Sequence, residues 1–246
     1  NVNWSFKNWE PIMIQPYNIT TTIKSDFDWQ NEILNLADCS GCVPETLGWT
    51  LLIGWDNINF VRKMSAGDAK QAWLRGDFNY IREPASRHIK NTEPMVKDGE
   101  ALRLFNHGMF TPNNGFVQDP NWPDTPMVTD LYKETFGEDP SGDIYEAYIL
   151  SAVWRDGLQK GLFMHPGANT EAVINAFEKM MANKESREYL ISKLGDYPMY
   201  FGKESNIIMD SLYSYVTKER LKLLVDFAKN NMEWSTAEYV DGKTIN

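Results

Sequence analysis

The sequence predicts an α/β fold with doubly wound, mainly parallel sheets. Two observations carry this prediction: short apolar strands alternate with helices of about ten residues from residue 59 onwards, and glycine or proline marks the joins between them. With 246 residues, 42% of them apolar, the chain can bury one large core or two modest ones. In such folds the ligand crevice lies beyond the carboxyl ends of the strands.

The first elements are predicted from branched residues, prolines and capping residues. Residues 11–23 mix β-branched residues with two prolines, which favours a pair of strands with a break between them. Residues 28–37 are predicted to form a helix, because Asp28 can cap its start and Glu32 can reach back to the cap.

A tight loop at residues 39–43 is predicted to lead into the next helix. Pro44 suits a first helical turn, and Glu45 suits the positive end of the helix dipole. The loop therefore lies at a helix N-terminus.

The remaining elements follow from apolar spacing and stop signals. Gly76 ends one helix and Pro84 starts another, while the prolines, Asn and Asp of residues 111–127 indicate a long surface connection. The predicted strands are residues 59–64, 78–81, 102–105 and 162–165. The predicted helices are residues 66–75, 129–136, 144–154, 169–183, 203–215 and 218–231, with one more beginning at Pro84.

Composition and motifs exclude several classes of protein. A formal charge of −10 without a basic run argues against a nucleic-acid partner. No stretch approaches the roughly 18 apolar residues of a spanning helix, which argues against direct membrane insertion. His88, His107 and His165 lie far apart without further ligands at metal-site spacing, and no hydrolase, metalloprotease or nucleotide motif is present.

Four phrases follow one another between residues 69 and 231: AWLRGDFNY, HIKNTEPMVKDGEALRL, WPDTPMVTDLY and LFMHPGANTEAVINAFEKMMANKESREYLISKLG. In order and spacing they resemble the phrases LLRGE, PHIKAGKLRAL, LPDVPT and LFAPAGTP, the last followed by a long helix and KLG. Those phrases belong to the periplasmic solute-binding receptors of tripartite tricarboxylate transporters, the TctC/Bug type. None of them is specific alone, so their shared order carries the resemblance.

The resemblance implies a two-lobed, periplasmic-binding-protein-like (type II) fold. Residues 18–150 would form the complete second lobe, and residues 1–17 and 151–246 a partial first lobe with C-terminal helices, its N-terminal part lacking. The implied protein is no enzyme and needs no cofactor. It would capture a small organic acid in the periplasm, after removal of a signal peptide, and pass it to membrane permease subunits. A sensor or assembly subunit without transport is an alternative.

The loop before Pro44 is the first candidate for ligand binding. The family carries a small, serine- and glycine-rich ligand loop here, and free backbone N–H groups at a helix N-terminus suit a carboxylate. A plain helix cap that meets only water is the alternative. The candidate residues are Ser40, Gly41, Cys42, Val43 and Thr46.

Arg82 is the second candidate, because it follows the predicted strand at residues 78–81 and could hold a carboxylate with two parallel hydrogen bonds. Asn79 and Tyr80 flank it with donor groups. The alternative is a structural ion pair of Arg82 with Glu83 or another neighbouring acid.

Trp154 and Arg155 are the third candidate, as an aromatic wall with one cation for a small organic acid. The family often has an aromatic residue near the cleft at this place. Trp154 also ends an apolar helix face, so a position in the core is the alternative.

Cys39 and Cys42 form a C-x-x-C pair at a helix start, which supports thiol exchange when the helix dipole stabilises a thiolate. A thiol-disulfide redox protein is therefore the rival function. A helix end, rather than an aromatic strand, leads into the pair, and in an oxidising compartment a structural disulfide or two unpaired thiols is the expected state.

Overall fold

The computed structural model describes residues 9–37, 42–61, 64–158 and 160–232, and the backbone of residues 239–240 and 243–244. The strands are β1 (Glu10–Gln15), β2 (Ile19–Lys24), β3 (Leu34–Ala37), β4 (Ile58–Val61), β5 (Tyr80–Pro84), β6 (Ala101–Asn106), β7 (Met109–Thr111), β8 (Gly115–Val117), β9 (Lys160–Met164), β10 (Tyr200–Phe201), β11 (Tyr239–Val240) and β12 (Lys243–Thr244). The helices are α1 (Val43–Ile53), the 3₁₀ turn η2 (Trp55–Asn57), α2 (Ala66–Arg75), α3 (Ala85–Asn91), α4 (Glu93–Lys97), α5 (Val128–Phe136), α6 (Asp143–Gly157), α7 (Thr170–Ala182), α8 (Lys184–Leu194), α9 (Lys203–Ser214) and α10 (Lys218–Met232).

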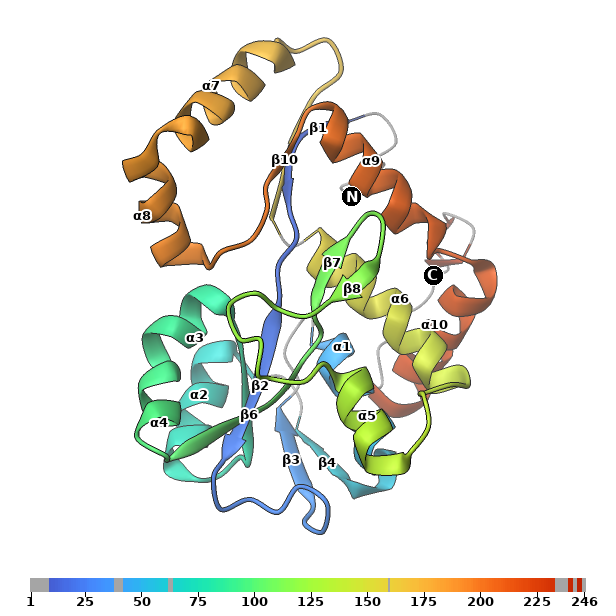
Figure 1. Ribbon diagram of the computed structural model, residues 1–246. Helices are drawn as coiled ribbons and strands as arrows, with labels where there is room; N and C mark the ends of the chain where they lie inside the picture. The colour runs from blue at the N-terminus through green and yellow to red at the C-terminus, as the bar shows by residue number, and fades with distance from the viewer. Residues whose placement is uncertain are drawn as a thin grey trace.

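These elements build a mixed α/β fold with two lobes, drawn one above the other in Figure 1. The lower lobe holds the sheet β5–β2–β6, the pair β3–β4 and helices α1 to α5. The upper lobe holds the sheet β10–β1–β9 with helices α7, α8 and α9. Helix α6 packs against both α1 and α10. The predicted α/β class and the two-lobed fold are confirmed.

The chain crosses between the lobes at residues 16–18. Strands β1 and β2 are both present where the sequence predicts a strand pair, but they pair with other strands instead of with each other. Pro16 has no N–H to donate, and Tyr17 donates its N–H to the carbonyl of Asp156 at the end of α6, 2.8 Å away. That hydrogen bond ties the crossing segment to the helix beside it.

The sheets are mixed, so the prediction of mainly parallel sheets is wrong in this detail. Strand β2 runs antiparallel to both of its neighbours, β5 and β6, because it enters from the other lobe in the reverse direction. Strands β5 and β6 therefore run parallel to each other, with α3 and α4 as the crossover between them. Strands β3 and β4 form a parallel pair.

Helix α2 shows why strongly marked elements are predictable. The hydroxyl of Ser65 accepts from the N–H of Asp68 at 3.1 Å, and Gly76 ends the helix in the left-handed region with a φ of 89°. Its bounds are those predicted. Helices α1, α5, α6, α7, α9 and α10 and strands β4, β5, β6 and β9 also lie within a few residues of their predicted positions.

The helix predicted at residues 28–37 is absent, because these residues form turns and then β3. Glu32 does accept from the N–H of Asp28, at 2.9 Å, but within a turn. Leu34 and Leu36 alternate with Asn35 and are fully buried, which is the period of a strand. Pairing with β4 and burial of two leucines outweigh the local capping signal.

The predicted surface connection at residues 111–127 is partly buried. It contains β8 and the turn of a hairpin with β7, and its Asp119 is fully buried. The carboxylate of Asp119 accepts hydrogen bonds from Asn18 in the crossing segment and from the hydroxyl of Tyr197. The connection therefore also braces the place where the two lobes meet.

The core of the lower lobe centres on Trp49 of α1. Its fully buried indole packs edge-on against Phe105 of β6 and Tyr80 of β5, with ring centroids 5.3 and 5.7 Å away. This packing fixes α1 against the sheet and sets the position of its N-terminus. Among the described residues, no helix has both the length and the apolar character needed to cross a membrane.

Candidate functional site

The N-terminus of α1 brings a carboxylate into the interior. Cys42 is the residue before the helix, Pro44 lies in its first turn, and Glu45 follows with its side chain fully buried. Proline fits here because the first helical N–H groups have no partner within the helix, and the positive end of the helix dipole favours an acid. The first turn of α1 therefore holds an acid where the helix dipole favours one, and packing of the helix buries it.

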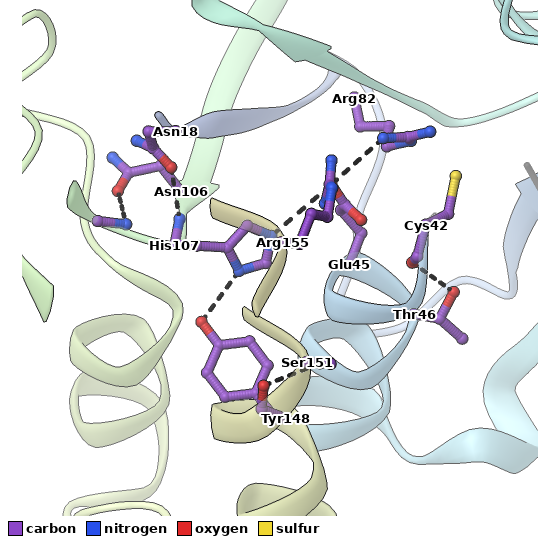
Figure 2. A network of polar contacts seen from close by, with 11 residues as sticks. Asn18, Cys42, Glu45, Thr46, Arg82, Asn106, His107, Tyr148, Ser151 and Arg155 are labelled. Atoms are coloured by element: carbon purple, nitrogen blue, oxygen red, sulfur yellow. Dashed lines mark hydrogen bonds and ion pairs between the residues drawn. The ribbon is translucent and has the colours of Figure 1, made fainter. Parts of the chain in front are cut away.

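Three side chains from distant parts of the chain surround Glu45 (Figure 2). Arg155 of α6 donates from Nη1 to Oε1 of Glu45, and Nη1 of Arg82 in β5 lies 3.6 Å from the same oxygen. Nε2 of His107, just after β6, lies 3.9 Å from it. Glu45, Arg82, His107 and Arg155, with Tyr148 behind His107, form what we call the arginine cluster.

Glu45 is ionised in this setting. Burial alone would raise its pKa, but the positive charges of Arg155 and Arg82 outweigh burial and lower the pKa to about 2. The side chains of Arg82 and Arg155 are only 18% and 12% exposed, so water screens their charges weakly. The cluster is therefore held together by charge at neutral pH.

His107 is neutral. Burial lowers its pKa to about 4, although Glu45 acts in the opposite direction. Its Nδ1 lies 2.9 Å from the hydroxyl of Tyr148, whose pKa burial raises well above the ordinary value. A neutral ring with its proton on Nε2, facing Glu45, accepts a hydrogen bond from Tyr148 at Nδ1. Its backbone N–H donates to Asn18 at 3.1 Å, which links the cluster to the crossing segment.

Asp156 adds a second buried acid next to the cluster. It is fully buried, and neither carboxyl oxygen has a hydrogen-bond partner within the described residues. Burial raises its pKa to about 8, Arg155 opposes the rise, and Glu45 adds to it. At neutral pH the group is a neutral carboxylic acid.

Unpaired polar atoms accumulate at this place. Three buried atoms here have no hydrogen-bond partner in the part of the chain that the structure describes. They are Nη2 of Arg155, Oε2 of Glu45 and Nε2 of His107. Buried polar groups in proteins are nearly always paired, and each unpaired one costs about 1–3 kcal/mol. Their concentration around two guanidinium groups makes the arginine cluster the candidate site.

The first candidate loop is described only in part. Ser40, Gly41 and Cys39 lie outside the described residues, so their predicted roles and the predicted Cys39–Cys42 pairing stay predictions. Cys42 is disulfide-bonded, and Val43 is the first helical residue. The hydroxyl of Thr46 donates to the carbonyl of Cys42 at 3.1 Å, so it stabilises the first turn of α1.

The second candidate group divides in the structure. Arg82 lies within β5, opposite Thr21 of β2, and not after the strand as predicted, because the strand starts and ends later in the sequence. The alternative predicted for Arg82 is an ion pair with Glu83 or another neighbouring acid. In the structure it forms an ion pair with Glu45. Tyr80 packs in the core, and the side chain of Asn79 accepts from the N–H of Asn35 at 2.9 Å. Of these three residues, Arg82 reaches the arginine cluster.

In the third candidate group the cation, and not the aromatic ring, reaches the cluster. Trp154 packs edge-on against Tyr213 of α9, with ring centroids 5.8 Å apart, whereas Arg155 turns toward Glu45. Adjacent residues of a helix point in directions about 100° apart, so the two side chains serve different surfaces.

The described surface has hollows of two sizes that bear on the site. A cavity of about 30 Å³, the size of one water molecule, is lined by Tyr80, Arg82 and Glu83, so it shares Arg82 with the arginine cluster. A hollow of about 580 Å³ lies beside the C-terminal end of α1, between Trp29 and Phe136. We place the candidate site at the arginine cluster, because the charged and unpaired groups gather there. Among the described residues, no group of His, Cys, Asp and Glu is arranged to hold a metal ion.

The fold is that of TctC/Bug-type receptors. The structure matches the crystal structure of a TctC solute binding protein from Polaromonas, which holds no ligand, with a TM-score of 0.50 and 13% identity over 85% of this chain and 68% of that one. Lower scores, 0.49 and 0.46, relate it to the periplasmic binding protein BugD and to MatC from Rhodopseudomonas palustris with bound malate. Both are 13% identical, over 90% and 84% of this chain and 69% and 68% of theirs.

No family model matches the sequence, and no curated protein matches it significantly. The resemblance noted in the sequence is thus confirmed at the level of the fold.

Proposed function

We propose that the chain is an extracytoplasmic solute-binding protein that captures a small organic anion, a carboxylate, at the arginine cluster. It delivers the anion to the permease subunits of a tripartite tricarboxylate-type transporter and itself catalyses no reaction. The shared fold with the Polaromonas solute binding protein supports this proposal.

The observation that carries the proposal is the unpaired Nη2 of Arg155. Arg155 uses Nη1 to bind Glu45, and Nη2 is buried beside it without a partner in the described residues. A carboxylate placed between Arg155 and Arg82 would accept from that nitrogen and gain a charge-assisted hydrogen bond. No apolar or cationic ligand would satisfy this donor.

Charge at the cluster also favours an anion. Arg82 and Arg155 are positive and Glu45 is negative, while His107 and Asp156 are neutral at pH 7 because burial shifts their pKa values to about 4 and about 8. The positive end of the α1 dipole points to the same place. Two positive groups thus face one negative group, within a chain whose formal charge is −10.

Binding at this place would couple the ligand to lobe closure. We assign residues 18–150 to one lobe and residues 1–17 and 151–246 to the other, so Arg82 and Arg155 come from different lobes. A carboxylate that contacts both arginines gains its full set of hydrogen bonds only when the lobes approach each other. The ligand then stabilises the closed form by its differential affinity for that form.

The experiment is to purify the chain without added acids and to record native mass spectra before and after denaturation. A small acid that leaves on denaturation identifies the ligand. If the chain is empty, calorimetric titration with succinate, glutarate and benzoate follows, each tested separately. Saturable binding of at least one carboxylate supports the proposal, and absence of both a bound acid and any binding contradicts it.

A further inference from the structure

Asp156 stands out among the buried acids because no described residue forms a hydrogen bond with its carboxyl group. Asp119 is equally buried, but its carboxylate accepts hydrogen bonds from Asn18, Asn121 and Tyr197. Both carboxyl oxygens of Asp156 lack a partner, although the residue directly follows Arg155. An unpaired buried carboxylate is far less stable than the neutral acid, so the geometry itself requires a bound proton.

The position of Asp156 connects this proton to the lobe junction. Its carbonyl accepts the N–H of Tyr17 in the crossing segment, 2.8 Å away, and its helix α6 ends one residue later. The crossing passes beside this end of α6 on its way from β1 to β2 (Figure 1).

The electrostatic surroundings of Asp156 are those of the arginine cluster. Arg155 on α6 and Arg82 on β5 favour its ionised form, while Glu45 on α1 disfavours it, as does burial. Tyr148 also lies within electrostatic reach of Asp156, and Tyr17 contacts its backbone from the crossing segment. Any anion that binds the two arginines would join Glu45 in opposing ionisation of Asp156.

We propose that the carboxyl group of Asp156 is a proton-binding site coupled to anion binding at Arg82 and Arg155. The anion binds while Asp156 is protonated, and loss of the proton at alkaline pH weakens binding. This inference rests on the proposed function. It follows from reciprocal linkage: a bound anion makes the Asp156 carboxylate less favourable, so an ionised Asp156 must make the bound anion less favourable by the same factor.

The direction in which pH changes the affinity for the anion follows from Asp156 being protonated at neutral pH. Below about pH 7 the acid is already protonated, so the dissociation constant for an anion should not change with pH through this group. Above the point where Asp156 ionises, the new negative charge offsets one of the two arginines. The Kd should then rise, by about tenfold for each unit by which the bound anion raises the pKa of Asp156.

The test is calorimetric titration with succinate, glutarate and benzoate at pH 7.0, 8.0 and 9.5, in two buffers of different ionisation enthalpy. For the tightest binder, the proposal predicts about tenfold weaker binding at pH 9.5 than at pH 7.0. It also predicts proton uptake on binding in the alkaline range. Asp156→Asn, which mimics the neutral acid, should show neither effect. Asp77→Asn, which alters an exposed acid paired with Arg75, is the matched control and should keep both.

A second measurement, on the unaltered chain, keeps the inference testable even if the Asp156→Asn variant folds poorly. The carbon-13 signal of the Asp156 carboxyl in the unaltered chain should titrate well above the range of ordinary aspartates, and its midpoint should move up when the carboxylate is bound. Binding without proton uptake, or an Asp156 signal that titrates in the ordinary range, would contradict the coupling but leave the proposed function standing. If none of the three carboxylates binds at any pH, the proposed function and the coupling are both contradicted.

Discussion

Arg155 and Glu45 are 110 residues apart in the sequence and form a buried hydrogen-bonded ion pair. Arg155 lies in the last turn of α6 and Glu45 in the first turn of α1, and the two helices pack against each other. The pair therefore fixes the end of one helix to the start of the other at the place where the chain crosses between lobes. Arg82 joins the pair from β5, so three elements of the fold meet at a single carboxylate.

Replacing Glu45 with Gln should destabilise the fold. The change leaves two buried guanidinium groups facing each other without their acid, and breaking a buried pair in this way costs about 3–5 kcal/mol. Glu146→Gln is the matched control, because Glu146 pairs with Arg220 but is 41% exposed, and its loss should cost less than about 1 kcal/mol. Urea unfolding of both variants checks this, and equal losses would show that the Glu45 pair is not structurally important.

Asp156→Asn should change how stability depends on pH. Burial raises the pKa of Asp156 to about 8 from an ordinary 3.8, so folding binds a proton between these values and stability falls as pH rises from about 4 to about 8. The free energy of unfolding should fall by about 1.4 kcal/mol for each pH unit within this window. The Asn variant should lose this slope and should be more stable than the parent at pH 8. Parallel stability curves for the two proteins from pH 5 to pH 8 would contradict the assignment.

His107 should contribute to the loss of stability in acid. Burial lowers its pKa from 6.5 to about 4, so its contribution is complete above pH 6.5 and is lost as pH falls toward 4. His107→Gln should flatten the melting temperature over this window, whatever its effect at pH 7. His165→Gln, at an exposed position, is the control and should leave the slope unchanged. The same slope in both variants would rule out His107 as its source.

Two elements show which parts of the fold can be predicted from the sequence. Helix α2 is predictable because Ser65 and Gly76 mark its ends locally, whereas β3 is not, because its strand state depends on pairing with β4 more than twenty residues later. The candidate site shows the same division between local and long-range signals. Arg82 and the start of α1 are recognisable as candidates from local signals. Glu45, His107 and Asp156 are not, because their importance arises from contacts between residues far apart in the chain.

Replacing Cys39 and Cys42 with Ser should separate the proposed binder from the rival redox protein. A disulfide between them would close a very short loop, so its stabilisation should be below the roughly 3 kcal/mol of a 15-residue loop. We expect a slightly lower melting temperature and a carboxylate affinity within a few-fold of the parent. A disulfide reductase activity in the parent that disappears in the variant, with stability and affinity unchanged, would favour the redox function.

The affinity of Arg82→Gln for the bound carboxylate tests the central claim most directly. This variant keeps Arg155 to pair with Glu45, so the fold should survive, and Arg75→Gln provides a control at an arginine that is 62% exposed. Charge-assisted hydrogen bonds contribute about 1.5–3 kcal/mol, so calorimetry at pH 7 should show Kd raised more than tenfold in Arg82→Gln and unchanged in Arg75→Gln. An Arg82→Gln protein that is folded and binds the carboxylate with the parent's affinity would show that the arginine cluster is not the binding site.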